Sequence, residues 1–241
     1  MDAGRGGSNN VVKLRVGTSG YSYKEWVGNF YPPKTPARQM LARYAERLDT
    51  VEINNTFYRM PTAPMLEKWN AEVPEHFRFV LKAPRRITHD RKLQDVDDLV
   101  RGLIDAAAVL GARLGPFLFQ LPPFYRKNLE VLGDFLGRLG PVRAAFEFRH
   151  ETWFEDPVYE LLRAHGAALC LADTEEGEPP QVATAPWGYL RLRRPDYDDA
   201  RLSAWAERVR AQPWEEAYVF FKHEDEGKGP ELAGRFRELA G

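Results

Sequence analysis

The chain of 241 residues is 44% hydrophobic and 12% aromatic, and its 34 Lys and Arg residues balance 35 Asp and Glu residues at a net charge of -1. This balance provides no global attraction for nucleic acid or for an anionic membrane. The single cysteine, Cys170, excludes an internal disulfide and a cysteine-based metal cluster.

Residues 1–10 are rich in Gly and Ser and lack the apolar segment of a signal peptide, so we expect a disordered N-terminal tail there. No apolar stretch approaches the length of a membrane span. We therefore expect a cytoplasmic protein without a membrane partner, in which residues 11–241 form one domain. The sequence carries no indication of an oligomeric state.

Short runs rich in β-branched and aromatic residues recur at roughly 30-residue spacing, as the strands of βα units do. These runs are 13–17, 50–54, 77–82, 116–121, 143–148, 167–172, 188–193 and 217–222.

Amphipathic stretches with helix start and stop signals separate these runs. They are 35–48, 62–73, 97–111, 128–140, 156–166, 198–212 and 229–241. The first two open with a Thr cap and a nearby Pro, and the third ends at Gly111. The sixth connection, 173–187, is rich in Glu, Pro and Gly, and its pattern predicts a loop.

Strands that alternate with helices predict an α/β fold with a parallel sheet, either open or closed. Eight even repeats in a chain of this length favour a single (β/α)₈ TIM-like barrel. No Gly-x-Gly-x-x-Gly follows the first strand, which disfavours an open dinucleotide-binding sheet.

Polar residues lie at nearly every predicted strand end, where barrels of this class carry their reactive groups. Side chains alternate along a strand, so Glu52 shares a side with Asn54, and Glu147 shares a side with Arg149. An isolated buried charge is costly, so a ring of such charges is either a salt-bridged plug or a ligand site. Glu147 or Glu52 is the candidate proton-transfer group, and His89 is a candidate general acid.

Cationic strand ends predict a cradle for phosphate or carboxylate. Lys82, Arg191 and Lys222 form this set, and Arg149 is a candidate anion clamp beside Glu147. The other candidates for substrate binding are Asn54, Gln120, Asp173, Tyr21, Trp26, Tyr58 and Trp153. The aromatic members, with Tyr23, would form a rim on which a sugar or a base stacks, or would pack the loops over the barrel mouth.

Several motifs occur together along the chain: GTSGY at 17–21, EINNTFY at 52–58, KAP at 82–84, QLPP at 120–123 and EFRH at 147–150. With Trp26, Trp153, Asp173 and the Phe pair at 220–221, they make the chain resemble the YecE-like family, known as domain of unknown function 72. The resemblance implies a TIM-like barrel with a site at these residues, and it implies no particular reaction.

The chain also departs from that family's pattern at two strand ends. Members often show Arg-x-His-Gly after the seventh strand, where this chain has Arg191-Leu192-Arg193-Arg194. They often show paired asparagines after the eighth, where this chain has Lys222-His223. If the missing groups serve catalysis, the chemistry of this chain is altered or lost.

The leading hypothesis is an enzyme that acts on a small anionic substrate, phosphorylated or sugar-like, with hydrolysis, isomerisation and lyase chemistry all open. One alternative is a non-catalytic nucleotide or nucleic-acid binding module that uses the aromatic rim and the basic loop 82–92. Another is a metal-dependent phosphodiesterase-like hydrolase, with Glu52, Glu147, Asp173 and His223 as ligands to a divalent metal. No tightly bound cofactor or metal is expected, because metal-binding spacings are missing and nearby Arg and Lys compete for the carboxylates.

Overall fold

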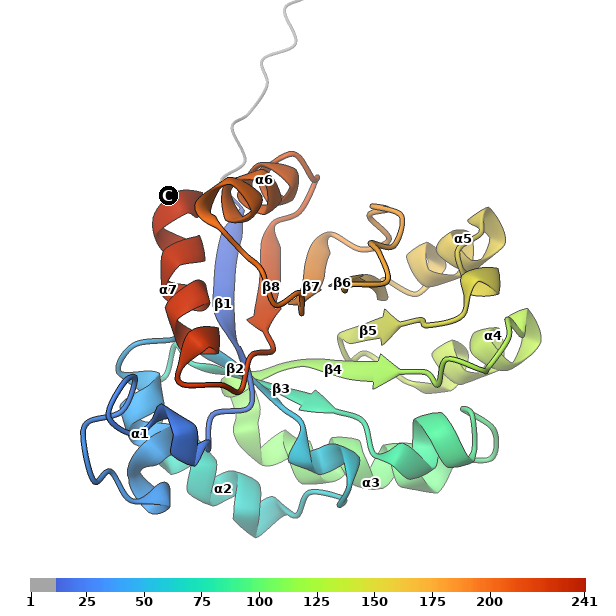
Figure 1. Cartoon of the computed structure of the whole chain (residues 1–241). Coiled ribbons are helices and arrows are strands. Elements are labelled where there is room, and N and C mark those ends of the chain that lie inside the picture. Colours follow the sequence, from blue (N-terminus) through green and yellow to red (C-terminus); the bar gives the residue numbers. More distant parts are fainter. Residues whose placement is uncertain (1–11) are drawn as a thin grey trace, which may run out of the picture.

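The computed structural model describes residues 12–241, and its strands close into a parallel barrel in chain order (Figure 1). The predicted (β/α)₈ fold is confirmed. The expected tail at residues 1–10 lies outside the described residues. The strands are β1 (Lys13–Ser19), β2 (Thr50–Ile53), β3 (Arg78–Lys82), β4 (Leu114–Gln120), β5 (Ala144–Glu147), β6 (Ala168–Asp173), β7 (Trp187–Leu192) and β8 (Glu216–Phe221).

Helices follow every strand except β6 in the described part of the chain, as the sequence predicts. They are α1 (Met40–Ala45), α2 (Ala63–Ala71), α3 (Asp97–Ala107), α4 (Leu129–Arg138), α5 (Asp156–Ala164), α6 (Asp199–Arg210) and α7 (Lys228–Ala240). Short helical turns lie in the loops, among them Asn55–Phe57 after β2 and the π-helical turn Arg86–Asp90 after β3. None of the helices of residues 12–241 is both long and apolar enough to cross a bilayer.

Helix starts follow the local chemistry of their caps. The side chain of Asn128 accepts a hydrogen bond from the backbone amide of Val131 at 3.1 Å, and the side chain of Asp198 accepts one from the amide of Arg201 at 2.8 Å. The expected first helix, 35–48, is wrong in its extent: only Met40–Ala45 is α-helical, after a 3₁₀ turn at Ala37–Gln39. The reason is that the Thr35 hydroxyl donates to the Pro32 carbonyl at 2.8 Å instead of capping a helix.

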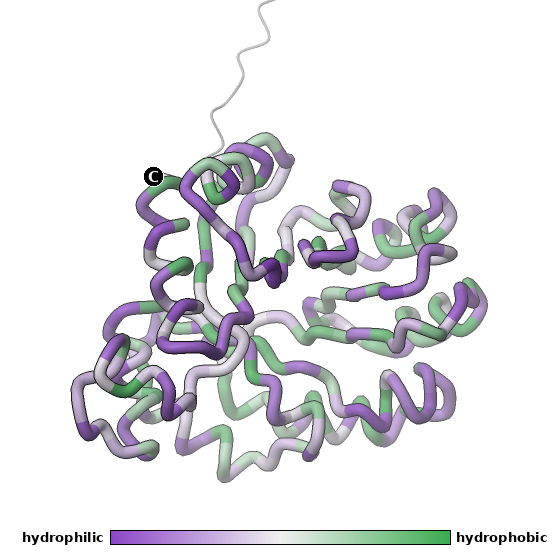
Figure 2. Tube along the Cα trace, in the orientation of Figure 1, coloured by the Kyte–Doolittle hydropathy of each residue, from purple (hydrophilic) through white to green (hydrophobic). Residues whose placement is uncertain are grey.

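Side chains alternate between the barrel interior and the surrounding helices. Along β7, Trp187 and Tyr189 belong to an interior cluster, whereas Leu190 and Leu192 pack in the larger core outside the barrel. Figure 2 shows hydrophobic residues along the strands and an alternation of hydrophobic and hydrophilic residues along α7. The interior also contains Val80, Leu118, Ala145, Ala168, Cys170, Ala172, Tyr218 and Phe220. Its upper layer is polar and forms the site described below.

Gly17 on β1 is required by a close approach of the neighbouring strand. A Cβ at this position would lie 2.0 Å from the carbonyl oxygen of Thr50 and 3.0 Å from the hydroxyl of Tyr44. The first of these contacts is with backbone, which cannot rotate away.

We therefore expect Gly17→Ala to lower the free energy of unfolding by about 1–3 kcal/mol, because the added methyl must displace β2 from β1. Gly102, in the middle of α3, is the matched control, since a Cβ there meets nothing within 4 Å. Gly102→Ala should stabilise the protein by roughly 0.5–1 kcal/mol. Urea unfolding of the two variants measures both effects, and equal stability of Gly17→Ala and wild type would contradict the register of β1 and β2.

Candidate functional site

A buried guanidinium joins two carboxylates across the upper layer of the barrel. Arg191, on β7, donates from Nη2 to Glu52 Oε1 at 2.8 Å and from Nη1 to Glu147 Oε2 at 2.5 Å. Glu52 lies on β2 and Glu147 on β5, and both side chains are 0% exposed. One arginine thus links three separate strands through charge-assisted hydrogen bonds.

Glu52 is saturated with donors. Besides Arg191, it accepts hydrogen bonds from the Ser19 hydroxyl at 2.7 Å and from the Tyr189 hydroxyl at 2.6 Å. Burial raises the pKa of Glu52, but the charge of Arg191 and these two hydrogen bonds outweigh that effect, so the pKa lies below its ordinary value. Glu52 is therefore an ionised carboxylate at neutral pH.

Glu147 is held by a second set of cations. Arg149 Nε donates to Glu147 Oε1 at 2.5 Å, and Arg193 Nη1 lies 3.9 Å from the same oxygen. Burial again raises the pKa of Glu147, but the charges of Arg191 and Arg149 prevail and lower it to about 2. Like Glu52, this carboxylate stays ionised at every pH near neutrality.

Above this layer lies a pocket of about 670 Å³ at the C-terminal ends of the strands. It is lined by Tyr23, Asn54, Asn55, Phe57, Tyr58, Lys82, Arg85, His89, Gln120, Arg149, Arg191, Arg193, Lys222 and Glu224. Six of these residues are Lys or Arg, and Glu224 is the one carboxylate among the described residues that line the pocket. The side-chain amides of Asn54 and Gln120 supply neutral donors and acceptors in the same space.

Lys82, Phe57 and His89 form a cluster at one side of the pocket. The Nζ atom of Lys82 lies 4.3 Å from the ring centroid of Phe57, and the His89 ring meets Phe57 edge-on at 4.9 Å. Burial and the charge of Arg191 lower the pKa of Lys82 to about 8. Burial, together with the charges of Lys82 and Arg85, also lowers the pKa of His89. Both groups therefore favour their neutral forms more than ordinary lysine and histidine do.

The segment that carries His89 has an irregular backbone. The π-helical turn Arg86–Asp90 is followed by three non-glycine residues with positive φ: Lys92 at 51°, Leu93 at 70° and Asp95 at 52°. Such conformations cost about 1–3 kcal/mol each and occur often at functional sites. Isolated π-turns show the same tendency.

Several predicted site residues lie outside the pocket. Asp173 points outward, because the inward positions on β6 fall on Ala168, Cys170 and Ala172. It accepts hydrogen bonds from Trp205 of α6 and from Tyr197, which precedes that helix. The rings of Trp26 and Trp153 are fully buried. Their indole nitrogens donate to the carbonyls of Glu224 and Tyr125, respectively, which ties loops together.

Tyr21 packs against Tyr44 of α1, with ring centroids 6.3 Å apart, and does not line the pocket. Of the expected aromatic rim, Tyr23 and Tyr58 line the pocket. The strand-end candidates Glu52 and Glu147 lie directly beneath the pocket. Tyr189 and Phe57 are not among the candidates that the sequence pattern indicates. Alternation would have identified Tyr189, which precedes Arg191 by two residues on the same side of β7.

The candidate metal ligands do not converge. Glu52 and Glu147 contact Arg191, Asp173 faces α6, and the His223 ring contacts the carbonyl of Arg194. Across residues 12–241, no three His, Cys, Asp or Glu side chains form a group that could hold a metal ion.

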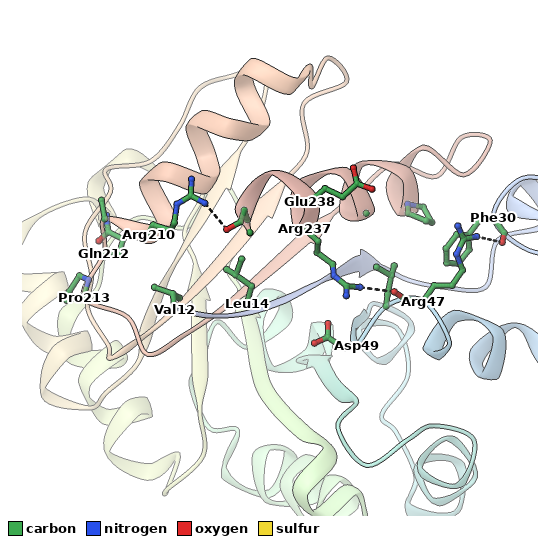
Figure 3. Close-up of a pocket in the computed structure, with 16 residues that line it drawn as sticks. Val12, Leu14, Phe30, Arg47, Asp49, Arg210, Gln212, Pro213, Arg237 and Glu238 are labelled. Atoms are coloured by element: carbon green, nitrogen blue, oxygen red, sulfur yellow. Dashed lines mark hydrogen bonds between the residues drawn. The ribbon is translucent and has the colours of Figure 1, made fainter. Parts of the chain in front are cut away.

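A larger cleft of about 1270 Å³ lies elsewhere, among the start of β1, α6 and α7 (Figure 3). Val12 and Leu14 line it, so it lies at the N-terminal end of the barrel. Its arginines are bound to the chain's own backbone: Arg210 donates to the carbonyl of Ala240, and Arg237 to that of Arg47. In barrels of this class that end serves stability, and we place the candidate site at the other end.

Comparison with known proteins identifies the family of the chain. Residues 15–241 match the family model described as "Protein of unknown function DUF72". The UPF0759 protein YunF of Bacillus subtilis (strain 168) is 26% identical over 226 residues, which are 87% of this chain and 78% of YunF. The UPF0759 protein YecE of Escherichia coli (strain K12) is 30% identical over 143 residues, which are 58% of this chain and 50% of YecE.

Solved structures agree with the barrel. A DUF72 family protein from Enterococcus faecalis V583 superposes with a TM-score of 0.77 at 19% identity, covering 94% of this chain and 95% of that one. A DUF72 family protein from Thermotoga maritima MSB8 superposes with a TM-score of 0.72 at 25% identity, covering 94% and 98%.

The buried ion pairs generate a stability prediction. Glu147→Gln removes the counter-ion of Arg191 and Arg149, so we expect a loss of about 3–5 kcal/mol at pH 7. The pKa of Glu147 is about 2, below its ordinary 4.5, so its contribution is complete above pH 4.5 and is lost as the pH falls towards 2. The stability difference between wild type and variant should therefore shrink across that range in urea unfolding.

Glu160 is the matched control, because it is exposed on α5. Glu160→Gln should change stability by less than about 0.5 kcal/mol. A Glu147→Gln protein as stable as wild type at pH 7 would show that the carboxylate is not required to balance Arg191.

Proposed function

The chain belongs to the DUF72 family of proteins of unknown function, and we propose that its barrel mouth binds a small anionic compound, phosphorylated or sugar-like, and acts on it as an enzyme. The observation that carries this proposal is the excess of positive charge in the pocket. Six Lys and Arg side chains line it, against Glu224 within the lining and the two carboxylates beneath it. A cleft of one sign attracts and concentrates a ligand of the opposite sign.

Two guanidinium groups of the pocket each have an unsatisfied donor within the described chain. Arg191 Nε and Arg193 Nη1 are buried and have no hydrogen-bond partner among the described residues. Buried polar groups are normally paired, so these two nitrogens favour an acceptor in the pocket. With Arg149 and Lys222 beside them, they would form a cradle for a phosphate or carboxylate group, while Asn54 and Gln120 would bind its hydroxyl or carbonyl groups.

In this proposal, Glu52 and Glu147 position the arginines instead of moving the proton. Both carboxylates stay ionised and saturated with donors, and neither lines the pocket. They would fix the guanidinium groups before the ligand arrives, which is how preorganised charge stabilises a transition state. His89 lines the pocket with a lowered pKa, so its neutral ring suits proton acceptance at pH 7. Hydrolysis, isomerisation and lyase chemistry all use such a combination.

A second candidate function is a non-catalytic module that binds a nucleotide or nucleic acid. It is favoured by the side chains at the rim: Tyr58 is 82% exposed and Phe124 is 68% exposed, and both are aromatic surfaces on which bases stack. Arg85 at the same rim has a side chain that is 62% exposed.

Anion binding is tested by thermal-shift and calorimetric titration with inorganic phosphate, sugar phosphates and organic acids. A ligand at one hundred times its dissociation constant should stabilise the wild type by about 2.7 kcal/mol. Arg149→Ala and Arg193→Ala should each weaken binding at least tenfold, because each removes a pocket cation. Arg101→Ala, on the exposed face of α3, is the matched control and should bind as wild type does. Binding that survives both pocket substitutions would refute the proposed site.

The second candidate predicts salt-dependent binding of short single-stranded oligonucleotides, without turnover. A double substitution, Arg85→Ala with Arg86→Ala, should weaken that binding and reduce its salt dependence. Binding that does not respond to salt would count against this function, as measured by fluorescence anisotropy at several ionic strengths.

A further inference from the structure

Lys82 differs from the arginines that line the pocket. Arg191 and Arg149 are bound to carboxylates, and Arg85 forms an ion pair with Asp90 at 3.2 Å. The Nζ atom of Lys82, in contrast, has no ion-pair or hydrogen-bond partner within residues 12–241 and lies over the face of Phe57. Lys222 likewise has no ion-pair partner in the described chain, but the amine of Lys82 also contacts an aromatic ring. An amine that is not bound to an acceptor keeps its lone pair available once it loses its proton.

We propose that Lys82 is a nucleophile that forms an imine with the carbonyl carbon of a small anionic aldehyde or ketone. The inference rests on the proposed function, because the cations of the same pocket would hold the anionic group of the substrate. It narrows the substrate class to anionic compounds that contain a carbonyl group, such as keto acids and ketose or aldose phosphates. It also changes the role of Lys82 from anion binding to covalent catalysis.

The position of Lys82 suits this reaction. It is the last residue of β3, its side chain turns into the pocket, and its own carbonyl is fixed by a 2.6 Å hydrogen bond from the Thr56 hydroxyl. Phe57 forms an apolar wall on one side of the amine. A lysine in such a partly desolvated site beside other cations is the usual form of an activated amine.

The groups with the largest effect on the pKa of Lys82 lie on several strands, and the pocket that Lys82 enters is also lined by Arg85, His89, Arg149, Arg193 and Glu224. Burial and Arg191 of β7 lower this pKa most, and Lys222 beyond β8 lowers it further. Glu52 of β2 and Glu147 of β5 act in the opposite direction, but both are already engaged by Arg191. The result is a pKa of about 8, so about one Lys82 in ten is unprotonated at pH 7.

The reaction balances without an additional reactant. The neutral amine of Lys82 adds to the carbonyl carbon, a C–N bond forms, and the π electrons of the C=O bond pass to oxygen. The oxygen then takes up a proton and the nitrogen gives one up, so that a neutral carbinolamine forms. The resulting carbinolamine loses its hydroxyl group as water with one further proton, and the nitrogen lone pair closes the C=N bond to give the iminium ion. His89 is the proton-transfer group within the cluster, since its ring packs on the same Phe57.

The test is reductive trapping on the full chain. The probes are pyruvate, glyoxylate, dihydroxyacetone phosphate and, as a neutral counterpart, dihydroxyacetone, each followed by sodium borohydride, which reduces an imine to a stable secondary amine. Intact mass spectrometry should show one adduct with at least one anionic probe, at least tenfold more than with the neutral one. Peptide mapping of the wild type should place the adduct on Lys82, a result that depends on no variant.

Two substitutions sharpen the assignment. Lys82→Arg keeps the charge but removes the amine, so trapping should fall at least tenfold. Lys92 is the matched control: its Nζ atom also lies near an aromatic ring, 5.5 Å from the centroid of Phe124, but it does not line the pocket. The Lys92→Arg variant should form the trapped adduct on Lys82 to the same extent as the wild type. The rate of trapping should rise with a midpoint near pH 8 and be about tenfold below its plateau at pH 7.

The outcomes separate this inference from the proposed function. If inorganic phosphate stabilises the protein but no anionic probe is trapped on Lys82, the imine is refuted and the anion pocket stands. If phosphate has no effect and nothing is trapped, both proposals fail. Adducts spread over surface lysines, or a midpoint at the pH of an ordinary lysine, would also overturn the role of Lys82.

Discussion

The upper half of the barrel depends on the placement of one buried positive charge. Arg191 is 2% exposed and contacts carboxylates from β2 and β5, so it connects strands on different sides of the barrel. A buried guanidinium without counter-ions would cost several kcal/mol, of the order of the whole stability of a domain. Glu52 and Glu147 must therefore remain ionised, and their hydrogen-bond partners must hold them in place. The arrangement is a salt-bridged layer, and it also forms the floor of a cavity.

A ring of charged strand ends can be a salt-bridged plug or a ligand site, and in this protein the two occur together. The carboxylates are used up by Arg191, Arg149 and the hydroxyls of Ser19 and Tyr189. The cations nearer to the mouth, Lys82 and Lys222, have no carboxylate bound to them in the described chain. Positive charge therefore remains on the side of the layer that faces the pocket, and it is this remainder that favours an anionic ligand.

The fold and the identity of the buried charges could be predicted from the sequence, because both depend on periodicity. Strand ends at regular spacing lead to a barrel, and alternation placed Glu52 on the same side as Asn54, and Glu147 on the same side as Arg149. The structure shows that both sides face inward. The same alternation, applied to β6, would have directed Asp173 outward, since the small residues Ala168, Cys170 and Ala172 take the inward positions. The prediction that Asp173 binds substrate rests on its place at the end of a strand, without regard to the side of the strand that its side chain faces.

Loop residues could not be placed in this way, because no period governs them. Trp26 and Trp153 are expected in the aromatic rim because they are aromatic residues in loops at the barrel mouth. Their indole rings are instead buried and donate hydrogen bonds to backbone carbonyls of other loops. The cluster of Lys82, Phe57 and His89 is assembled by two short helical turns that follow different strands, and one of them is a π-turn. Neither turn has a sequence signal strong enough to predict the packing of an imidazole and an ammonium group on one ring.

Alternation also explains what the departures from the family pattern do. Arg193 and Lys222 continue the inward sides of β7 and β8, and both line the pocket. His223 faces the other way, where its ring packs near Tyr197 and Phe221. His223 therefore lies outside the pocket, whereas Arg193 and Lys222 line it. Both of these residues add positive charge to the pocket, and the charge of Lys222 also lowers the pKa of Lys82.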